Sequence, residues 1–125
     1  MSRASVGALS ALGRSLGVTL AALIHSCWAL ALAHVDARSV KAFDRHTGTA
    51  DIVFCTVLSG RDIAVSGVEQ MLGLLIATLP LRVQICNDAG TGTLGGLMRE
   101  VQTAMTAISS HQFCNLAEIA AWAGL

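Results

Sequence analysis

The first apolar residues of the chain recur at helical spacing. Residues 5–17 carry apolar side chains three or four positions apart, at Val6, Leu9, Leu12 and Leu16. This spacing predicts an amphipathic helix, and Gly17 is suited to ending it, because glycine readily adopts the left-handed conformation that closes helices. Thr19 can cap a second helix that runs through Ala33. The chain is therefore expected to begin with two helices joined at a glycine.

A polar stretch and then a strand follow these helices. Residues 34–50 hold much of the charge and the turn signal TGT, which predicts a long loop with a short helical piece at most. Residues 51–60 are rich in Val, Ile, Phe and Thr without clean alternation, which is typical of a strand buried on both faces. Cys27 and Cys55 lie within apolar runs and are interpreted as small core residues.

The only proline of the chain marks a change from helix to strand. Residues 68–77 are predicted to form a helix with Glu69 in its first turn, where the helix dipole favours a carboxylate. Residues 78–86 then alternate, so that four apolar side chains share one face: Leu79, Leu81, Val83 and Ile85. Pro80 has no N–H to donate, so it is expected at the start of a strand or on an edge strand.

Two further helices complete the pattern. After a turn-rich loop, Thr93 can cap a helix whose apolar face carries Leu94, Leu97, Val101, Met105 and Ile108. Asn115 and Glu118 have the spacing of a capping box at the start of a last helix. The order ααβαβαα predicts an α/β fold with helices packed on a small mixed sheet. With 125 residues, the chain is long enough for one domain and too short for two.

Composition makes the chain unusually apolar. Hydrophobic residues make up 54% and charged residues 13%, against about 45–50% and about 25% in ordinary soluble domains. The formal net charge is zero, tyrosine is absent and Lys and Arg form no cluster, so the pattern argues against nucleic-acid binding. The apolar excess points instead to surface that a partner covers, or to lipid.

A membrane segment is the weaker of these two interpretations. The best candidate is the apolar run at residues 16–34, which is close to the lower length limit for a spanning helix. His25 and Ser26 lie at its centre, where polar groups are costly in lipid, and Trp28 is internal rather than at an end. The start of the chain also makes a poor signal peptide. We therefore expect a helix buried between a sheet and a second helix, and keep a small membrane protein as an alternative.

Candidate chemistry is sparse. The four cysteines form no CxxC pair, which favours a reduced, cytoplasmic setting and argues against a zinc site. The histidines show no metal-ligand spacing, and the lone His25 fits a hydrogen-bonded core residue better than a ligand. The glycine-rich residues 90–96 lack the ending of a phosphate-binding loop. Arg61, next to Ser59 and Gly60, could clamp an anion or form a salt bridge with Asp62 that pins a loop, and the residues alone leave both open.

Longer stretches resemble a known family. DIVFCTVLSGRD and GVEQMLGLLIATLPLRV resemble the condensation domains of nonribosomal peptide synthetases, whose pattern there is FGxxxSGR followed by GVExMxGxFxNTxPxRV. SLGVTLAALIHSCWALALA upstream resembles the same family, and SSHQFCNLAEIAAWAGL downstream resembles its HQxxxLAEIQxxAGL pattern. The likeness covers nearly the whole chain apart from an insertion around residues 34–44.

The resemblance implies a chloramphenicol-acetyltransferase-like fold in which two lobes form a V. Such domains condense acyl or peptidyl groups held as thioesters on the phosphopantetheine arms of carrier proteins. Their active-site motif is HHxxxDG, which this sequence lacks. The likeness maps to the C-terminal lobe, whose later strands would follow Leu125, so residues 1–125 are expected to form part of that lobe. The chain itself would bind no cofactor directly, and its partners would be carrier-protein domains or a complementary lobe.

Family residues match at some positions and differ at others. The matches are expected to shape the tunnel side of the lobe and hold it together, with structural rather than catalytic roles: Ser59, Gly60, Arg61, Thr78, Pro80 and Arg82. The usual Gly, Phe and Asn are replaced by Cys55, Leu75 and Ala77. The sequence therefore predicts a condensation-domain fragment that is inactive alone. The alternatives are a non-enzymatic module that docks a carrier protein or lobe, and a small membrane protein.

Overall fold

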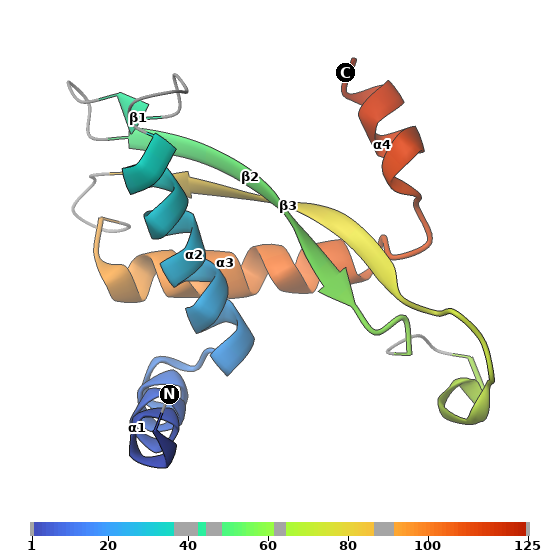
Figure 1. The fold of residues 1–125 in the computed structure, drawn as a ribbon, viewed down its shortest axis with the longest axis horizontal. Coiled ribbons are helices and arrows are strands. Elements are labelled where there is room, and N and C mark those ends of the chain that lie inside the picture. The colour runs from blue at the N-terminus through green and yellow to red at the C-terminus, as the bar shows by residue number, and fades with distance from the viewer. Residues whose placement is uncertain (1, 37–42, 45–48, 62–64, 87–91, 125) are drawn as a thin grey trace.

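The computed structural model describes residues 2–36, 43–44, 49–61, 65–86 and 92–124. Figure 1 shows the elements in chain order: α1 (Arg3–Leu16), α2 (Leu20–Asp36), β1 (Phe43–Asp44), β2 (Thr49–Leu58), the 3-10 helix η1 (Val68–Gln70), β3 (Ala77–Ile85), α3 (Leu94–Ser109) and α4 (Leu116–Trp122). The fold class predicted from the sequence is confirmed, with helices packed on a small sheet. The turns predicted in residues 45–48 and 87–91 lie outside the described residues.

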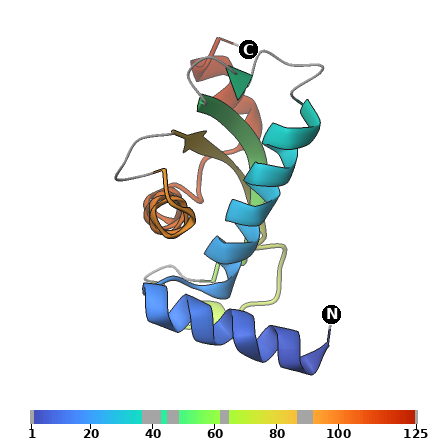
Figure 2. The same cartoon turned by 90° about the vertical axis from the view of Figure 1, so that its left-hand side faces the viewer.

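The joint between α1 and α2 forms at the predicted glycine. Gly17 adopts φ 69°, and its N–H donates to carbonyls of the last turn of α1. The Thr19 hydroxyl accepts the N–H of Ala22 at 3.2 Å and so caps α2. The N–H and hydroxyl of Thr19 also donate to the side-chain oxygen of Gln102 on α3, at 2.9 and 2.8 Å. Thr19 therefore both caps α2 and connects it to α3. Figure 2 shows α1 turning away from α2 at this joint.

The sheet has the order β1-β2-β3, and both strand pairs are antiparallel, whereas the sequence suggested a mixed sheet. β2 and β3 pair along their length, from Ala50 opposite Ile85 to Leu58 opposite Ala77. The alternation predicted for β3 is confirmed, since Leu79, Leu81 and Val83 are buried. These side chains lie on the face covered by α2 and α3. Pro80 lies on β3, which is an edge strand among the described strands, as expected for a proline.

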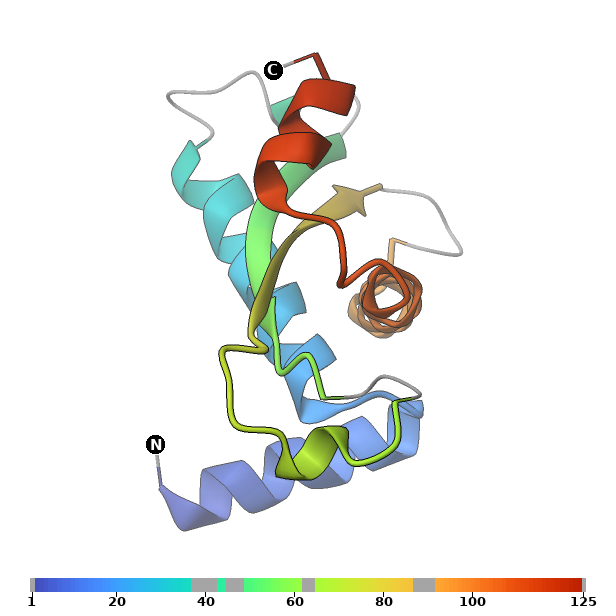
Figure 3. The ribbon, with the colours of Figure 1, turned by 90° about the vertical axis from the view of Figure 1, so that its right-hand side faces the viewer.

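The prediction that residues 51–60 are buried on both faces is wrong. Alternate residues of β2 are buried, among them Ala50 and Ile52, while Asp51, Val53, Cys55 and Val57 are exposed. The reason is that α2 and α3 pack against one face of the sheet, where they form the core cluster with residues of β3. On the other side, α4 makes a small contact with β3 and buries none of its own residues. Figure 3 shows α4 apart from α2 and α3.

The predicted helix at residues 68–77 is also wrong. Only Val68–Gln70 are helical there, in η1, and the chain from Met71 to Ile76 has no regular structure. A helix there would have no surface to cover its apolar face, since Leu72 and Leu74 are 103% and 89% exposed. Helix propensity without tertiary packing is a weak determinant of structure. The carbonyl of Val68 is also bound by the Arg61 side chain, although an α-helix would use it internally.

Several predicted core positions prove to be exposed. Cys27 and Cys55 were expected in the core, but both are exposed, and all four cysteines are free thiols. α2 buries one side only: Ala22, Leu23 and Ala29 are buried, whereas Trp28 is 54% exposed. The expectation of a helix covered nearly all round therefore fails, because the described residues supply no element against its outer side.

The two C-terminal helices begin at the predicted caps. The Thr93 side chain accepts the N–H of Gly96, and the reciprocal bonds between Asn115 and Glu118 complete a capping box. The core side of α3 carries Leu97, Met98 and Val101, whereas Leu94, assigned to that side from the sequence, is half exposed. Leu97, Val101, Met105 and Ile108 of the predicted face do contact the core, so the differences are the half-exposed Leu94 at the first position of α3 and the additional buried Met98.

Within the described residues, no single helix is long and apolar enough to cross a membrane. The helices α1 and α2 reach that length and hydrophobicity only when taken together, and they are bent by 99° at their junction. Ser26, at the centre of the apolar run, is fully buried in this fold and donates to the carbonyl of Ala22 at 2.8 Å.

Candidate functional site

Gly60 closes the far end of the β2–β3 hairpin. Its φ of 67° lies in the left-handed region, which side chains rarely tolerate. A Cβ at this position would lie 1.7 Å from the carbonyl oxygen of Leu75. Glycine is therefore required for two reasons, the backbone conformation and the close approach of the returning chain. We call residues 59–61 and 65–76 the hairpin tip.

Arg61 holds the hairpin tip together. Its Nη1 donates to the carbonyl oxygens of Val68 at 2.8 Å, Glu69 at 3.3 Å and Met71 at 3.2 Å, and its Nη2 donates to Met71 at 3.2 Å. Between the two interpretations left open by the sequence, these bonds favour a loop-pinning role. The pinning acts through backbone carbonyls, and the proposed partner Asp62 lies outside the described residues. These bonds engage the Nη1 group and one N–H of the Nη2 group of the guanidinium, which has five N–H donors in all.

Ser59 belongs to the same turn. Its hydroxyl accepts the backbone N–H of Arg61 at 3.3 Å. This short-range bond is typical of serine in turns. It joins the first and last residues of the SGR motif just after the end of β2, so the motif acts as one structural unit.

Arg82 forms an ion pair on the exposed face of the sheet. Its Nε donates to both carboxylate oxygens of Asp51, at 2.8 and 3.1 Å, and its Nη2 donates to Oδ2. The hydrogen bond from Arg82 holds the pKa of the Asp51 carboxyl below its ordinary value, and Asp51 in turn raises the pKa of Arg82. The side chains are 62% and 46% exposed, and pairs this exposed contribute little to stability. The pair links β2 to β3 across the strands.

The remaining motif residues lie on the same sheet face. Thr78 stands opposite Val57 and is exposed, while Pro80 stands opposite Cys55 and is half-buried. No hydrogen bond from the Thr78 hydroxyl to another described residue is formed. The positions of Thr78 and Pro80 on this face therefore follow from the pairing register of β2 and β3.

One pocket brings three separate motif segments together. It has a volume of about 450 Å³ and is lined by Gly60, by residues 74–78 and by residues 112–116. We call it the motif pocket. Ser59 and Arg61 line a neighbouring pocket of about 400 Å³ with Val57, Leu58 and residues 73–76. The sequence did not predict that residues 112–116 line a site, although their HQFCNL segment is part of the family resemblance.

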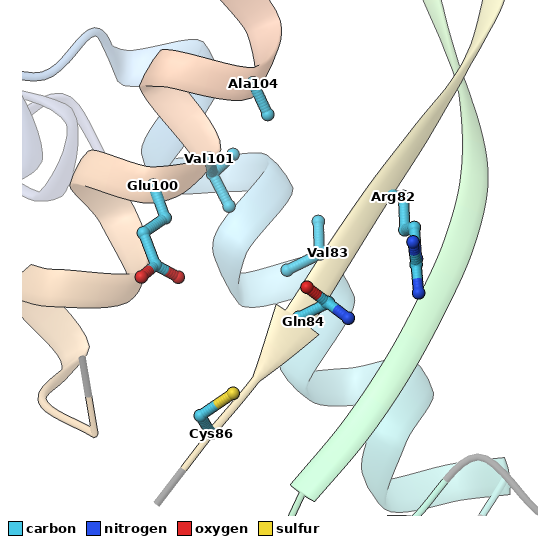
Figure 4. A pocket seen from close by; sticks show the side chains of 7 residues that line it. All are labelled: Arg82, Val83, Gln84, Cys86, Glu100, Val101 and Ala104. Atoms are coloured by element: carbon cyan, nitrogen blue, oxygen red, sulfur yellow. The ribbon is translucent and has the colours of Figure 1, made fainter. Parts of the chain in front are cut away.

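Arg82 lies away from these two pockets. It lines a groove of about 290 Å³ between β3 and α3, shown in Figure 4. The structure therefore does not gather all of the matched residues at one place. Gly60 and Thr78 share the motif pocket, Ser59 and Arg61 lie beside it, and Arg82 stands farther along β3.

His25 is a structural histidine in this arrangement. Its Nδ1 lies 2.7 Å from the carbonyl oxygen of Ala21, and its Nε2 lies 2.8 Å from the hydroxyl of Thr56 on β2. The ring stacks on Phe54 with centroids 5.8 Å apart. A carbonyl accepts only, so Nδ1 carries a proton. The predicted hydrogen-bonded role is confirmed, and the Thr56 hydroxyl is buried.

The described part of the chain holds no group of three or more His, Cys, Asp or Glu side chains that could bind a metal ion. Its motif residues brace the hairpin tip and the sheet by hydrogen bonds to backbone and to Asp51. The arrangement can therefore shape a surface and hold it rigid, with no acid–base pair at the motif pocket.

Comparison with known proteins matches these motif segments to a family. The model of the family described as "Condensation domain" matches residues 3–123. Chondramide synthase cmdD of Chondromyces crocatus is 36% identical over 92% of this chain, and Nonribosomal peptide synthetase 8 of Aspergillus fumigatus is 34% identical over 93%. The chain spans only 3% and 1% of these proteins.

Solved structures have the same fold. The crystal structure of holo T3CT aligns with a TM-score of 0.66 and 30% identity, covering 83% of this chain and 21% of that one. The first condensation domain of the calcium-dependent antibiotic synthetase, in complex with a substrate analogue, aligns with a TM-score of 0.63 over 90% of this chain and 22% of that one. At 17% identity, the second likeness concerns the fold alone. The chain thus corresponds to about a fifth of each solved chain.

Proposed function

Because this chain belongs to the condensation-domain family and is a fragment of a nonribosomal peptide synthetase condensation domain, we propose that it acts as the scaffold of one lobe and is inactive alone. The observation that carries the proposal is the hairpin tip. Gly60 admits the Leu75 carbonyl, and Arg61 binds three further carbonyls. These contacts support a role in shaping the motif pocket rather than in proton transfer.

The reaction of the complete domain would join carrier-bound thioesters through an amide bond. The phosphopantetheine arms would arrive as parts of the carrier-protein substrates, in a cytoplasmic setting. The sequence contains no HHxxxDG, and so lacks the histidine that the family resemblance places at the attacking amine. In this proposal Ser59, Gly60 and Thr78 shape the tunnel side, while Arg61 and Arg82 stabilise the elements that carry it.

An assay with loaded carrier proteins tests the inactivity. The purified chain is incubated with a donor carrier protein bearing an acyl thioester and an acceptor carrier protein bearing an aminoacyl thioester. We expect no amide product above the background without protein, measured by mass spectrometry of the carrier-bound products. Amide formation that depends on this chain alone would overturn the proposal. A complete condensation domain serves as the positive control.

A docking module is the second candidate, and exposed apolar surface favours it. On the open face of the sheet, Val53 and Val57 are 60% and 66% exposed, and at the hairpin tip Leu72 is fully exposed. Large exposed apolar patches mark interaction sites. The partner would be a carrier protein or a complementary lobe. Titration of the chain with a phosphopantetheinylated carrier protein and, separately, with a complementary lobe tests this function, and the absence of saturable binding to both partners would count against it.

A further inference from the structure

We draw no further inference here: the strongest candidate, the exposed apolar surface of Leu72, Leu74 and Ile76 at the hairpin tip next to the motif pocket, carries none, because the chain spans only about a fifth of each solved chain that it matches and nothing in the structure shows what covers this surface.

Discussion

A side chain at position 60 would meet the carbonyl oxygen of Leu75, because the Cβ would lie 1.7 Å from that oxygen. This approach joins the end of β2 to the segment that leads into β3. Together with Arg61 it defines the hairpin tip and one wall of the motif pocket. The first two predictions concern these two residues.

Gly60→Ala should destabilise the fold strongly. The left-handed backbone costs a non-glycine residue about 1–2 kcal/mol, and the clash with Leu75 adds to it, so we expect a loss of more than about 2 kcal/mol in urea unfolding. Gly67→Ala is the matched control. Gly67 also has a left-handed φ, of 78°, but nothing lies within 4 Å of a Cβ there. Equal losses in the two variants would show that the Leu75 contact has no effect.

Arg61→Lys should loosen the hairpin tip without unfolding the core. A lysine keeps the charge but lacks the planar fork that reaches the carbonyls of Val68 and Met71 together. Hydrogen exchange should therefore quicken at the amides of residues 68–71, while the amides of Leu81 and Val83 keep their protection. Unchanged exchange at the tip would contradict the bracing role of Arg61.

The Asp51–Arg82 pair gives a small acid dependence of stability. The pKa of Asp51 is lowered in the folded state, chiefly by its hydrogen bond to Arg82. Its contribution is therefore complete above the ordinary aspartate value of 3.8, and is lost as pH falls through the lower folded value. Compared with Asp51→Asn, the native chain should gain stability near pH 7 and lose that gain at strongly acid pH. Urea unfolding across this range measures the difference, and a gain that persists at the lowest pH would argue against the pair.

His25→Ala should leave the buried Thr56 hydroxyl without its partner. An unsatisfied buried hydroxyl costs about 1–3 kcal/mol, and the stacking on Phe54 is lost as well. Because Thr56→Val removes the group that needs the bond, the double variant should lose less than the sum of the single losses. Additive losses in a double-mutant cycle of unfolding free energies would mean that the two side chains are not coupled.

The sequence-based predictions succeeded where local rules decide the structure. The alternation of apolar and polar residues correctly predicted the buried face of β3. Gly17 ends α1 as predicted, and Asn115 with Glu118 forms the expected capping box. These features depend on residues close together in the chain. The register that sets Pro80 opposite Cys55 follows from long-range pairing, and the sequence limited it only to an edge or a strand start.

The predictions failed where the structure depends on packing against segments that are distant in the sequence. Residues 71–76 have an apolar run suited to a helix, but Leu72 and Leu74 find nothing to pack against and Arg61 takes the carbonyl of Val68. Cys55 lies in an apolar strand, yet its face of the sheet is open. The motif pocket joins Gly60 to residues 112–116, and no spacing rule predicts contact across such a separation.

The most direct test of the scaffold role is reconstitution with a separately produced condensation-domain fragment that carries HHxxxDG. Amide product from loaded donor and acceptor carrier proteins is measured with both fragments, with each fragment alone, and with the Gly60→Ala variant. The account predicts product only when both fragments are present, and much less with the variant. Equal product when this chain is omitted, or product from this chain alone, would contradict it.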